Sequence, residues 1–557
     1  YFQRLRRGFV AADSRQIWAA EMRPAYEAAL GVLHLAYQVT GDRHWLARAW
    51  QMADHSRGLL LRDALQEGIA RLAGGLPPAL RQQEADLADS LAAAEKAVFD
   101  LLNLTSDSAL TALRRQKNRV FNWRQAYQSL IQRLEADYPA YVQLKYSDPS
   151  PGLPALRQSL QGPQDALIAF FAGDTSLFVL GLTPAAESFE HVPIDDTLIG
   201  ALAELRGHLT NRQEAESRGH DATLRARIAQ LSHALFLRLL EPSAQTLGLR
   251  FEPADNPPAL TLIPDGWLGY LPFEVLLPRL PGPDLPDYGS FPYLLRYRQI
   301  QYAYASHLAL APASDRPAPR LYLGMAPDYG DASLTRLQSH LPEIQATRSL
   351  MQGRAWLGRE ASEGLFREQA PHYRILHLAM HTVLDEQDAR YSFLAFAKPR
   401  DSTMADKNDG RLHAYEIAQL DLSAELAVLS ACGTGQGPLL RGEGVMSLAR
   451  AFRLAGCAHL VMSLWEADDQ ATARLMETFF RYLKEGHGKS AALRQARLDY
   501  LAQSAYRHPA YWAAFVLVGD NQSVPMPGPR WPWWVGGGLL LLGLGYFFWK
   551  RATTRSG

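Results

Sequence analysis

The chain has 557 residues, 47% of them hydrophobic, which is enough to bury a large core in about three or four structural units. Lysine and arginine total 57, as do aspartate and glutamate, so the net charge is zero and nucleic acid is not an expected partner. The two cysteines, Cys432 and Cys457, are too few for a disulfide framework.

The first part of the chain is predicted to be helical. Apolar residues recur every three or four positions over 23–37 and again over 45–60, and Thr40-Gly41-Asp42 interrupts the pattern. Aromatic and small residues alternate along this helical hairpin, as they do in a tetratricopeptide unit. The hairpin is therefore either the partner-binding end of a helical repeat or a plain helical cap. Because the chain opens on Tyr1 within it, we expect residues 1–76 to be a truncated repeat region.

A second helical pair follows. Residues 87–101 and 120–134 carry apolar stripes of helical period, which predicts an antiparallel pair or linker over 77–137. Proline and glycine then gather between 138 and 152 and mark a boundary.

Beyond this boundary, short apolar runs bounded by turn residues predict β-strands. They lie at 166–171, 177–182, 260–263, 321–324, 375–379, 426–429 and 460–464. Stretches of helical period separate them, at 224–240, 442–454 and 471–483. Strands that alternate with helices indicate a mostly parallel sheet covered on both faces, so we expect an α/β domain over 138–524.

The region near the end of the chain is predicted to cross a membrane once. Residues 531–549 are apolar and uncharged, about the minimum length that spans a bilayer. Trp533 and Trp534 at one end, and Tyr546 and Trp549 at the other, would lie at the two interfaces. A buried core helix is the weaker alternative, because five glycines and the lack of a polar face make a poor helix in water.

The orientation of this span, 530–550, depends on its flanking charges. Lys550, Arg551 and Arg555 follow it and Arg530 precedes it, which favours a cytoplasmic tail at 551–557 and an extracytoplasmic body. A tail anchor with a cytosolic body is the alternative. The sequence therefore predicts a membrane protein and leaves the side of its body open.

Two residues that can carry chemistry follow predicted strands. His381 follows the strand at 375–379, and Cys432 follows the strand at 426–429 among small residues and glycine. If the strands are neighbours in a parallel sheet, the imidazole and the thiol face one gap, as in a cysteine nucleophile paired with a histidine base. A small buried thiol is the alternative for Cys432. A metal site at His377 and His381 is less favoured, and His377 is more simply a core histidine with a hydrogen-bond partner.

Five motifs in order resemble the CHAT family, caspase-like domains that occur beside tetratricopeptide repeats and are related to separase. They are HLAMH (377–381), LSACGTG (429–435), GEGV (442–445) with AF (451–452) and AG (455–456), SLW (463–465) with Asp468 and Asp469, and HPAYWAAF (508–515). The resemblance runs from about residue 138 to 520 and covers most of the chain before the predicted span.

This resemblance implies a cysteine peptidase with His381 as general base and Cys432 as nucleophile. Thr382 and Gly433 would supply backbone groups to the oxyanion hole, although the family has glycine where this chain has Thr382, whose branched side chain crowds the hole. Asp469, with Asp468 beside it, would bind a basic side chain of the substrate, which implies cleavage after Arg or Lys. Asp468 serves equally well as the N-cap of the helix that follows.

The resemblance leaves a second class of function open, a catalytically silent scaffold that recruits partners through its helical part. We expect a protein substrate, a protein activator bound by the helical region, and no cofactor or metal. The polar loop at 398–412 is a place for regulation or a plain surface loop. Cys457 is expected to be a packing residue.

Overall fold

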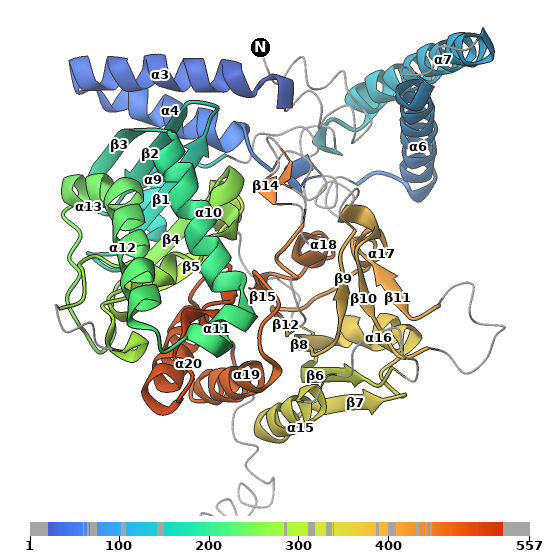
Figure 1. The fold of residues 1–557 in the computed structure, drawn as a ribbon. Coiled ribbons are helices and arrows are strands. Elements are labelled where there is room, and N and C mark those ends of the chain that lie inside the picture. Colours follow the sequence, from blue (N-terminus) through green and yellow to red (C-terminus); the bar gives the residue numbers. More distant parts are fainter. Residues whose placement is uncertain are drawn as a thin grey trace, which may run out of the picture.

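The computed structural model describes residues 20–58, 61–63, 66, 75–101, 107–141, 150–282, 287–309, 318–329, 337, 339–385, 389–398, 408–430, 434–437, 439–440, 444–445 and 448–526 (Figure 1). Its centre is an 11-stranded sheet in the order β3-β2-β1-β4-β5-β16-β15-β12-β8-β6-β7. The strands of this sheet are β1 (Ala166–Ala172), β2 (Ser176–Leu182), β3 (Glu187–Pro193), β4 (Ala259–Ile263), β5 (Gln299–Tyr302), β6 (Arg320–Pro327), β7 (Arg354–Gly358), β8 (Tyr373–Leu378), β12 (Leu426–Leu429), β15 (His459–Ser463) and β16 (Phe515–Val518).

Most neighbouring strands of this sheet run parallel. The antiparallel pairs are β1–β2, β2–β3 and β15–β16. Every strand predicted from an apolar run is present, and the α/β fold with a mostly parallel sheet is confirmed. β3 (ESFEHVP) and β5 (QIQY) are rich in polar residues, so apolar runs could not reveal them. β7 (RAWLG) and β16 (FVLV) are likewise missing from the predicted strands, although β16 is wholly apolar.

Helices cover both faces of the sheet. The helices of the described ranges are α3 (Arg23–Thr40), α4 (Arg43–His55), α6 (Pro78–Leu101), α7 (Asp107–Asp137), α9 (Leu153–Ser159), α10 (Asp196–Thr210), α11 (Arg212–Arg218), α12 (Ala222–Leu239), α13 (Glu241–Leu247), α14 (Ser306–Ala309), α15 (His340–Met351), α16 (Glu363–Gln369), α17 (Ala414–Ile417), α18 (Leu448–Leu454), α19 (Asp469–Lys484), α20 (Lys489–Gln503) and α21 (Pro509–Trp512). Of these, α6 and α7 pack on each other rather than on the sheet (Figure 1). Two small sheets complete the fold, β11-β10-β9 and β13-β14, with strands β9 (Thr382–Val383), β10 (Phe393–Ala395), β11 (Arg411–His413), β13 (Leu439–Leu440) and β14 (Gly444–Val445).

At β1, the two faces of the sheet belong to different hydrophobic cores. In β1, Ile168 and Phe170 join the core beneath α10 and α12, whereas Leu167 and Phe171 join the core beneath α3 and α4. Neighbouring residues of a strand point to opposite faces, so an unbroken apolar run such as β1 needs cover on both sides. The predicted helical hairpin is thus present as α3 and α4, and it buries one of its faces on the sheet (Figure 1).

The second predicted helical pair is also present, as α6 and α7. Arg133 near the end of α7 donates to Gln83 near the start of α6 over 3.2 Å, so the two helices run antiparallel. One prediction in the second half is wrong in part: a helix over 442–454 is found only from Leu448, and Gly444–Val445 form β14 instead. Glycine weakens a helix interior, which explains the late start.

None of the helices in the described ranges is long and apolar enough to cross a bilayer. The predicted span at 531–549 and the tail at 551–557 lie outside those ranges. Residues 399–407 of the polar loop also lie outside them, whereas Arg411 and Leu412 belong to β11.

Candidate active site

The strands that precede His381 and Cys432 are neighbours, as predicted. β8 and β12 run parallel, and Leu378 lies opposite Leu429 at their carboxyl ends. His381 follows Leu378 by three positions, and Cys432 follows Leu429 by the same number. Cys432, like both of its neighbours at 431 and 433, lies outside the described residues. The pairing of the strands is therefore confirmed, and the position of the thiol stays a prediction.

His381 is held by Tyr329. The backbone N–H of His381 donates to the Tyr329 hydroxyl over 2.8 Å, and that hydroxyl donates to the Ala395 carbonyl over 3.0 Å. The N–H of Ala395 in turn donates to the His381 carbonyl over 2.9 Å. The rings of His381 and Tyr329 lie 5.2 Å apart between centroids, at 41°. Backbone and imidazole are thus both oriented by a tyrosine that no motif of the sequence marks.

Thr382 begins the short strand β9. It lies opposite Leu394 of β10 in an antiparallel pair, a setting that suits a β-branched residue. Its hydroxyl is buried and has no hydrogen-bond partner among the described residues. The branched side chain therefore occupies space next to the histidine, where a glycine would leave the backbone open.

A narrow pocket, which we call the acidic pocket, lies beside these strand ends. α19 contributes Asp469 and Thr472 to it, and α15 contributes His340 and Glu343, each pair one turn apart. The strand ends and loops supply the other lining residues, which are Leu337, Met380, Ser430, Ser463, Ala467 and Phe515. The cavity measures about 20 Å³, room for about one water molecule. Two carboxylates from neighbouring helices therefore face a small space at the edge where β12 ends.

Glu343 is a residue of this site that the sequence did not reveal. It is 4% exposed, and its Oε1 lies 2.8 Å from Nε2 of the fully buried His377. Nδ1 of His377 lies 2.9 Å from the Tyr322 hydroxyl and 3.2 Å from the Thr347 hydroxyl. Both ring nitrogens thus have protein partners, which confirms His377 as a core histidine. No group of three or more His, Cys, Asp or Glu that could hold a metal occurs within the described ranges.

His340 adds a neutral wall to the acidic pocket. Its Nε2 lies 3.0 Å from the Pro327 carbonyl, and its Nδ1 is buried without a hydrogen-bond partner among the residues described. Burial lowers the pKa of His340, and the charges of Asp469 and Glu343 oppose that shift without cancelling it. The His340 imidazole is therefore neutral and does not compensate the negative charge of the two carboxylates.

Asp468 has a different role from Asp469. Its carboxylate accepts from the N–H groups of Gln470 and Ala471, at 3.1 and 2.9 Å, so it is the N-cap of α19. It also forms an ion pair with Arg212 over 2.9 Å. The structure therefore places Asp468 at the helix cap and Asp469 in the acidic pocket.

Cys457 is fully buried, and burial raises the pKa of its thiol to about 12. A thiol in that state is a poor nucleophile at neutral pH. Its structural setting agrees with the predicted packing role.

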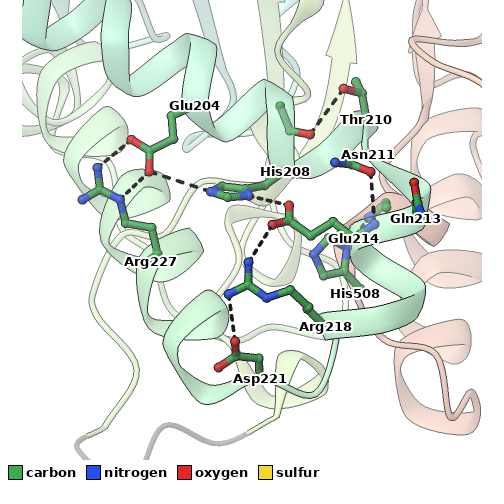
Figure 2. A network of polar contacts seen from close by, with 12 residues as sticks. Glu204, His208, Thr210, Asn211, Gln213, Glu214, Arg218, Asp221, Arg227 and His508 are labelled. Carbon is green, nitrogen blue, oxygen red and sulfur yellow. Dashed lines mark hydrogen bonds and ion pairs between the residues drawn. The ribbon is translucent and has the colours of Figure 1, made fainter.

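The segment that begins at His508 packs against helices at its start, and its last residue, Phe515, lines the acidic pocket. Figure 2 shows His508 beside a network in which His208 Nδ1 lies 2.7 Å from Glu214, and Arg218 binds both Glu214 and Asp221. Burial lowers the pKa of His508 to about 4, so its ring is neutral at neutral pH. The start of this motif therefore supports the fold around the site.

Comparison with known proteins tests the resemblance. Residues 229–520 match the model of the CHAT domain. The match starts inside α12 and ends just after β16, so it takes in the whole candidate site. β1, β2 and β3 precede it, although β1 pairs directly with β4 in the same sheet.

The chain is also 31% identical over 116 residues to tetratricopeptide repeat protein 28 of Mus musculus and of Homo sapiens, an alignment that covers 21% of this chain and 5% of each relative. Among solved structures, the Saccharomyces cerevisiae separase–securin complex is 11% identical with a TM-score of 0.41, covering 79% of this chain and 37% of that one. The Arg-specific cysteine proteinase gingipain R is 9% identical with a TM-score of 0.34, covering 54% of this chain and 68% of that one. The chain thus spans a small part of the length of the curated relatives it matches. The family is assigned from the match of residues 229–520 to the CHAT domain.

Proposed function

This chain belongs to the CHAT domain family, and from that premise we propose that it is a cysteine endopeptidase that cleaves protein substrates after arginine or lysine. The observation that carries the proposal is the acidic pocket beside the paired ends of β8 and β12. His381 follows the end of β8 by three residues, and Cys432 follows the end of β12 by three residues.

In the proposed reaction, Cys432 attacks the carbonyl carbon of the scissile bond while His381 takes the thiol proton. The N–H groups of Thr382 and Gly433 stabilise the oxyanion, and the imidazolium returns its proton to the leaving amine. Water then hydrolyses the thioester. The contacts of Tyr329 support this role of His381, because an oriented base needs no rearrangement during proton transfer.

The loop that would carry the nucleophile is anchored on both sides. Ser430 lines the acidic pocket, and the Thr434 hydroxyl accepts from the N–H of Ser463 over 3.2 Å. Gly435 donates to the Ser463 carbonyl over 2.8 Å. Because two residues span at most about 7 Å, chain connectivity keeps Cys432 within that reach of both Ser430 and Thr434.

The charges of the acidic pocket support basic specificity. A guanidinium or ammonium group would meet the carboxylates of Asp469 and Glu343 in a site that excludes most water, where ion pairs are strong. At about 20 Å³ the pocket is smaller than an arginine side chain, so it has to widen before a substrate binds. We therefore propose latent activity that a protein partner of the helical region switches on.

A catalytically silent scaffold is the second candidate. Thr382 favours it, since its side chain fills space that a glycine would leave open beside the oxyanion hole. Membrane attachment through residues 531–549 is compatible with both candidates and is proposed on the apolar sequence of that segment.

The test compares the wild-type chain with Cys432→Ala and Cys457→Ala, using peptides that differ only in Arg, Lys or Gln before the cleaved bond. We expect Cys432→Ala to abolish both cleavage and labelling by an arginyl chloromethyl ketone, and Cys457→Ala to keep both, because the Cys457 thiol is buried and protonated. Cleavage that survives Cys432→Ala contradicts the peptidase. A Cys432 that stays unlabelled even with a natural partner present supports the scaffold.

A further inference from the structure

A second cavity, which we call the rear cavity, lies behind the acidic pocket on the other face of the sheet. In the β15–β16 pair, Ser463 lies opposite Phe515, and both line the acidic pocket. Met462 lies opposite Val516, and both line the rear cavity. Successive residues of a strand point to opposite faces, so the two cavities stand back to back across one pair of strands.

The rear cavity is larger and mostly apolar. It measures about 70 Å³, several times the space that one water molecule needs. Leu271, Leu464 and Val518 extend its apolar wall, and Arg57, just after α4, reaches it from the helical hairpin. It therefore lies where the N-terminal helices meet the sheet.

Arg57 is a buried cation without an ion-pair partner among the described residues. It is 4% exposed, its Nε donates to the Ala53 carbonyl over 2.9 Å, and its Nη1 donates to the Ile263 carbonyl over 3.3 Å. Its Nη2 is buried and makes no hydrogen bond within the described ranges. Buried charges in proteins are normally paired, so this side chain lacks the anion that such a site requires.

The acidic groups near Arg57 already have other partners. Asp265 binds Arg23 and accepts from the N–H groups of Ala172 and Gly266, both over 2.9 Å. Oδ1 of Asp54 accepts from the N–H of Ser306 over 2.7 Å, and its Oδ2 makes no hydrogen bond within the described ranges and lies 3.6 Å from Nδ1 of His307. Burial lowers the pKa of Arg57 even though the charges of Asp265 and Asp54 act to raise it. Asp265 also lines the rear cavity, and its carboxylate is already bound to Arg23, so Nη2 of Arg57 is a buried cationic group at this cavity that lacks a hydrogen-bond partner among the described residues.

The wall of the rear cavity touches the loop that carries Cys432. Gly435 lines the cavity and follows Cys432 by three positions. A Cβ placed on Gly435 would lie 3.0 Å from the Ser463 carbonyl oxygen, 3.2 Å from the Met462 sulfur and 3.3 Å from Leu464. Gly435 therefore leaves no room for a side chain between itself and the end of β15, and its N–H donates to the Ser463 carbonyl over 2.8 Å.

We infer that the rear cavity binds a short-chain carboxylate, with Arg57 as its counter-ion, and that this ligand controls the reactivity of Cys432 through Gly435. Binding stands on the geometry of the cavity, and control of Cys432 rests on the proposed function. The carboxylate is either a free acid or the acidic side chain of a partner protein, and these share one chemistry.

The binding test follows the methyl signal of Met462 by NMR in full-length protein labelled at methionine methyl groups. Butyrate is expected to shift it with a Kd on the order of 1 mM, as suits a ligand of this size. Butyramide, which has the same shape without the charge, should bind about tenfold more weakly. Arg57→Gln should remove this preference and Arg57→Lys should keep part of it. If Arg57→Gln fails to fold, Val518→Phe fills the cavity instead and should abolish butyrate binding.

The coupling test measures alkylation of Cys432 by iodoacetamide with and without butyrate. A rate change of threefold or more that disappears in Arg57→Gln or Val518→Phe supports control of the loop. N-acetylglutamate N-methylamide, tested in the same way, shows whether an acidic side chain replaces the free acid. Equal affinity for butyrate and butyramide overturns the site, and binding without a rate change overturns the control. Selective butyrate binding with a Cys432 that is never alkylated, even with a natural partner present, leaves the site standing and supports the scaffold.

Discussion

At the scale of single residues, the two carboxylates of the acidic pocket have different surroundings. Asp469 is the first residue of α19, where the helix dipole favours a negative charge. Glu343 is bound to His377, which ties it to the core behind the pocket. Asp469 is therefore the residue of the acidic pocket at which the proposed specificity can be tested with the least effect on the core.

Asp469→Asn is expected to lower kcat/KM for an arginine peptide by roughly 30- to 1,000-fold, or about 2 to 4 kcal/mol, because the bound guanidinium loses its charged partner in a dry site. Steady-state kinetics with otherwise identical Arg, Lys and Gln peptides measure this change. The loss should be confined to the basic peptides, so an equal loss on the Gln peptide would sink the specificity assignment.

Asp468→Asn is the matched control one position earlier. Asparagine caps helices as well as aspartate does, so only the ion pair with Arg212 is lost. That Arg212 side chain is 51% exposed, and such pairs contribute about 0 to 1 kcal/mol. The variant should keep its preference for arginine.

At the scale of elements, α3 is joined to the sheet by buried polar contacts as well as by apolar packing. Arg23 at the start of α3 forms an ion pair with Asp265 and donates to the Ala172 carbonyl over 3.1 and 2.7 Å. Its guanidinium also lies 4.3 Å from the centre of the Phe171 ring. The helical hairpin is thus part of the same folded body as β1.

Asp265→Asn is expected to destabilise the chain by about 3 to 5 kcal/mol, because it leaves the Arg23 cation buried without its partner. The double variant Arg23→Met with Asp265→Asn removes both charges and should recover part of that loss. Chemical denaturation of the three proteins measures the difference. A double variant no more stable than Asp265→Asn would show that the ion pair is not the source of the effect.

At the scale of the whole molecule, one sheet connects the part matched by the family model with strands that precede it. β1, β2 and β3 extend the sheet from β4, and α3 and α4 cover one of its faces. The acidic pocket and the rear cavity open on the two faces of this sheet, and the rear cavity is the one that Arg57 of the helical part reaches. Arg57 of the helical part and Gly435, three positions after Cys432, therefore line the same cavity.

The membrane proposal also belongs to this scale. The full chain is expected to stay with the membrane fraction after extraction at alkaline pH, because residues 531–549 are apolar and long enough to span a bilayer. A chain that ends at Gly528 should be released. Release of the full chain by the same treatment would contradict an integral anchor.

From the sequence alone, seven strands of the central sheet could be predicted, since apolar runs such as LAVL in β12 need burial on both faces wherever they are placed. The strands β3, β5, β7 and β16 were not predicted. The sequence also shows that His381 and Cys432 follow two such runs, and its five motifs indicate the CHAT family. These features are local, so no knowledge of distant contacts was needed.

Only the tertiary structure decided which single polar residues share a site. Tyr329, Glu343 and Arg57 carry no motif, and each acquires its role from contacts with residues far away in the chain. Asp468 and Asp469 are adjacent residues of the same type. Because α19 starts between them, Asp468 is the N-cap of the helix and Asp469 lines the acidic pocket. Burial and direction of a side chain arise from packing, which is why they could not be read from composition or spacing.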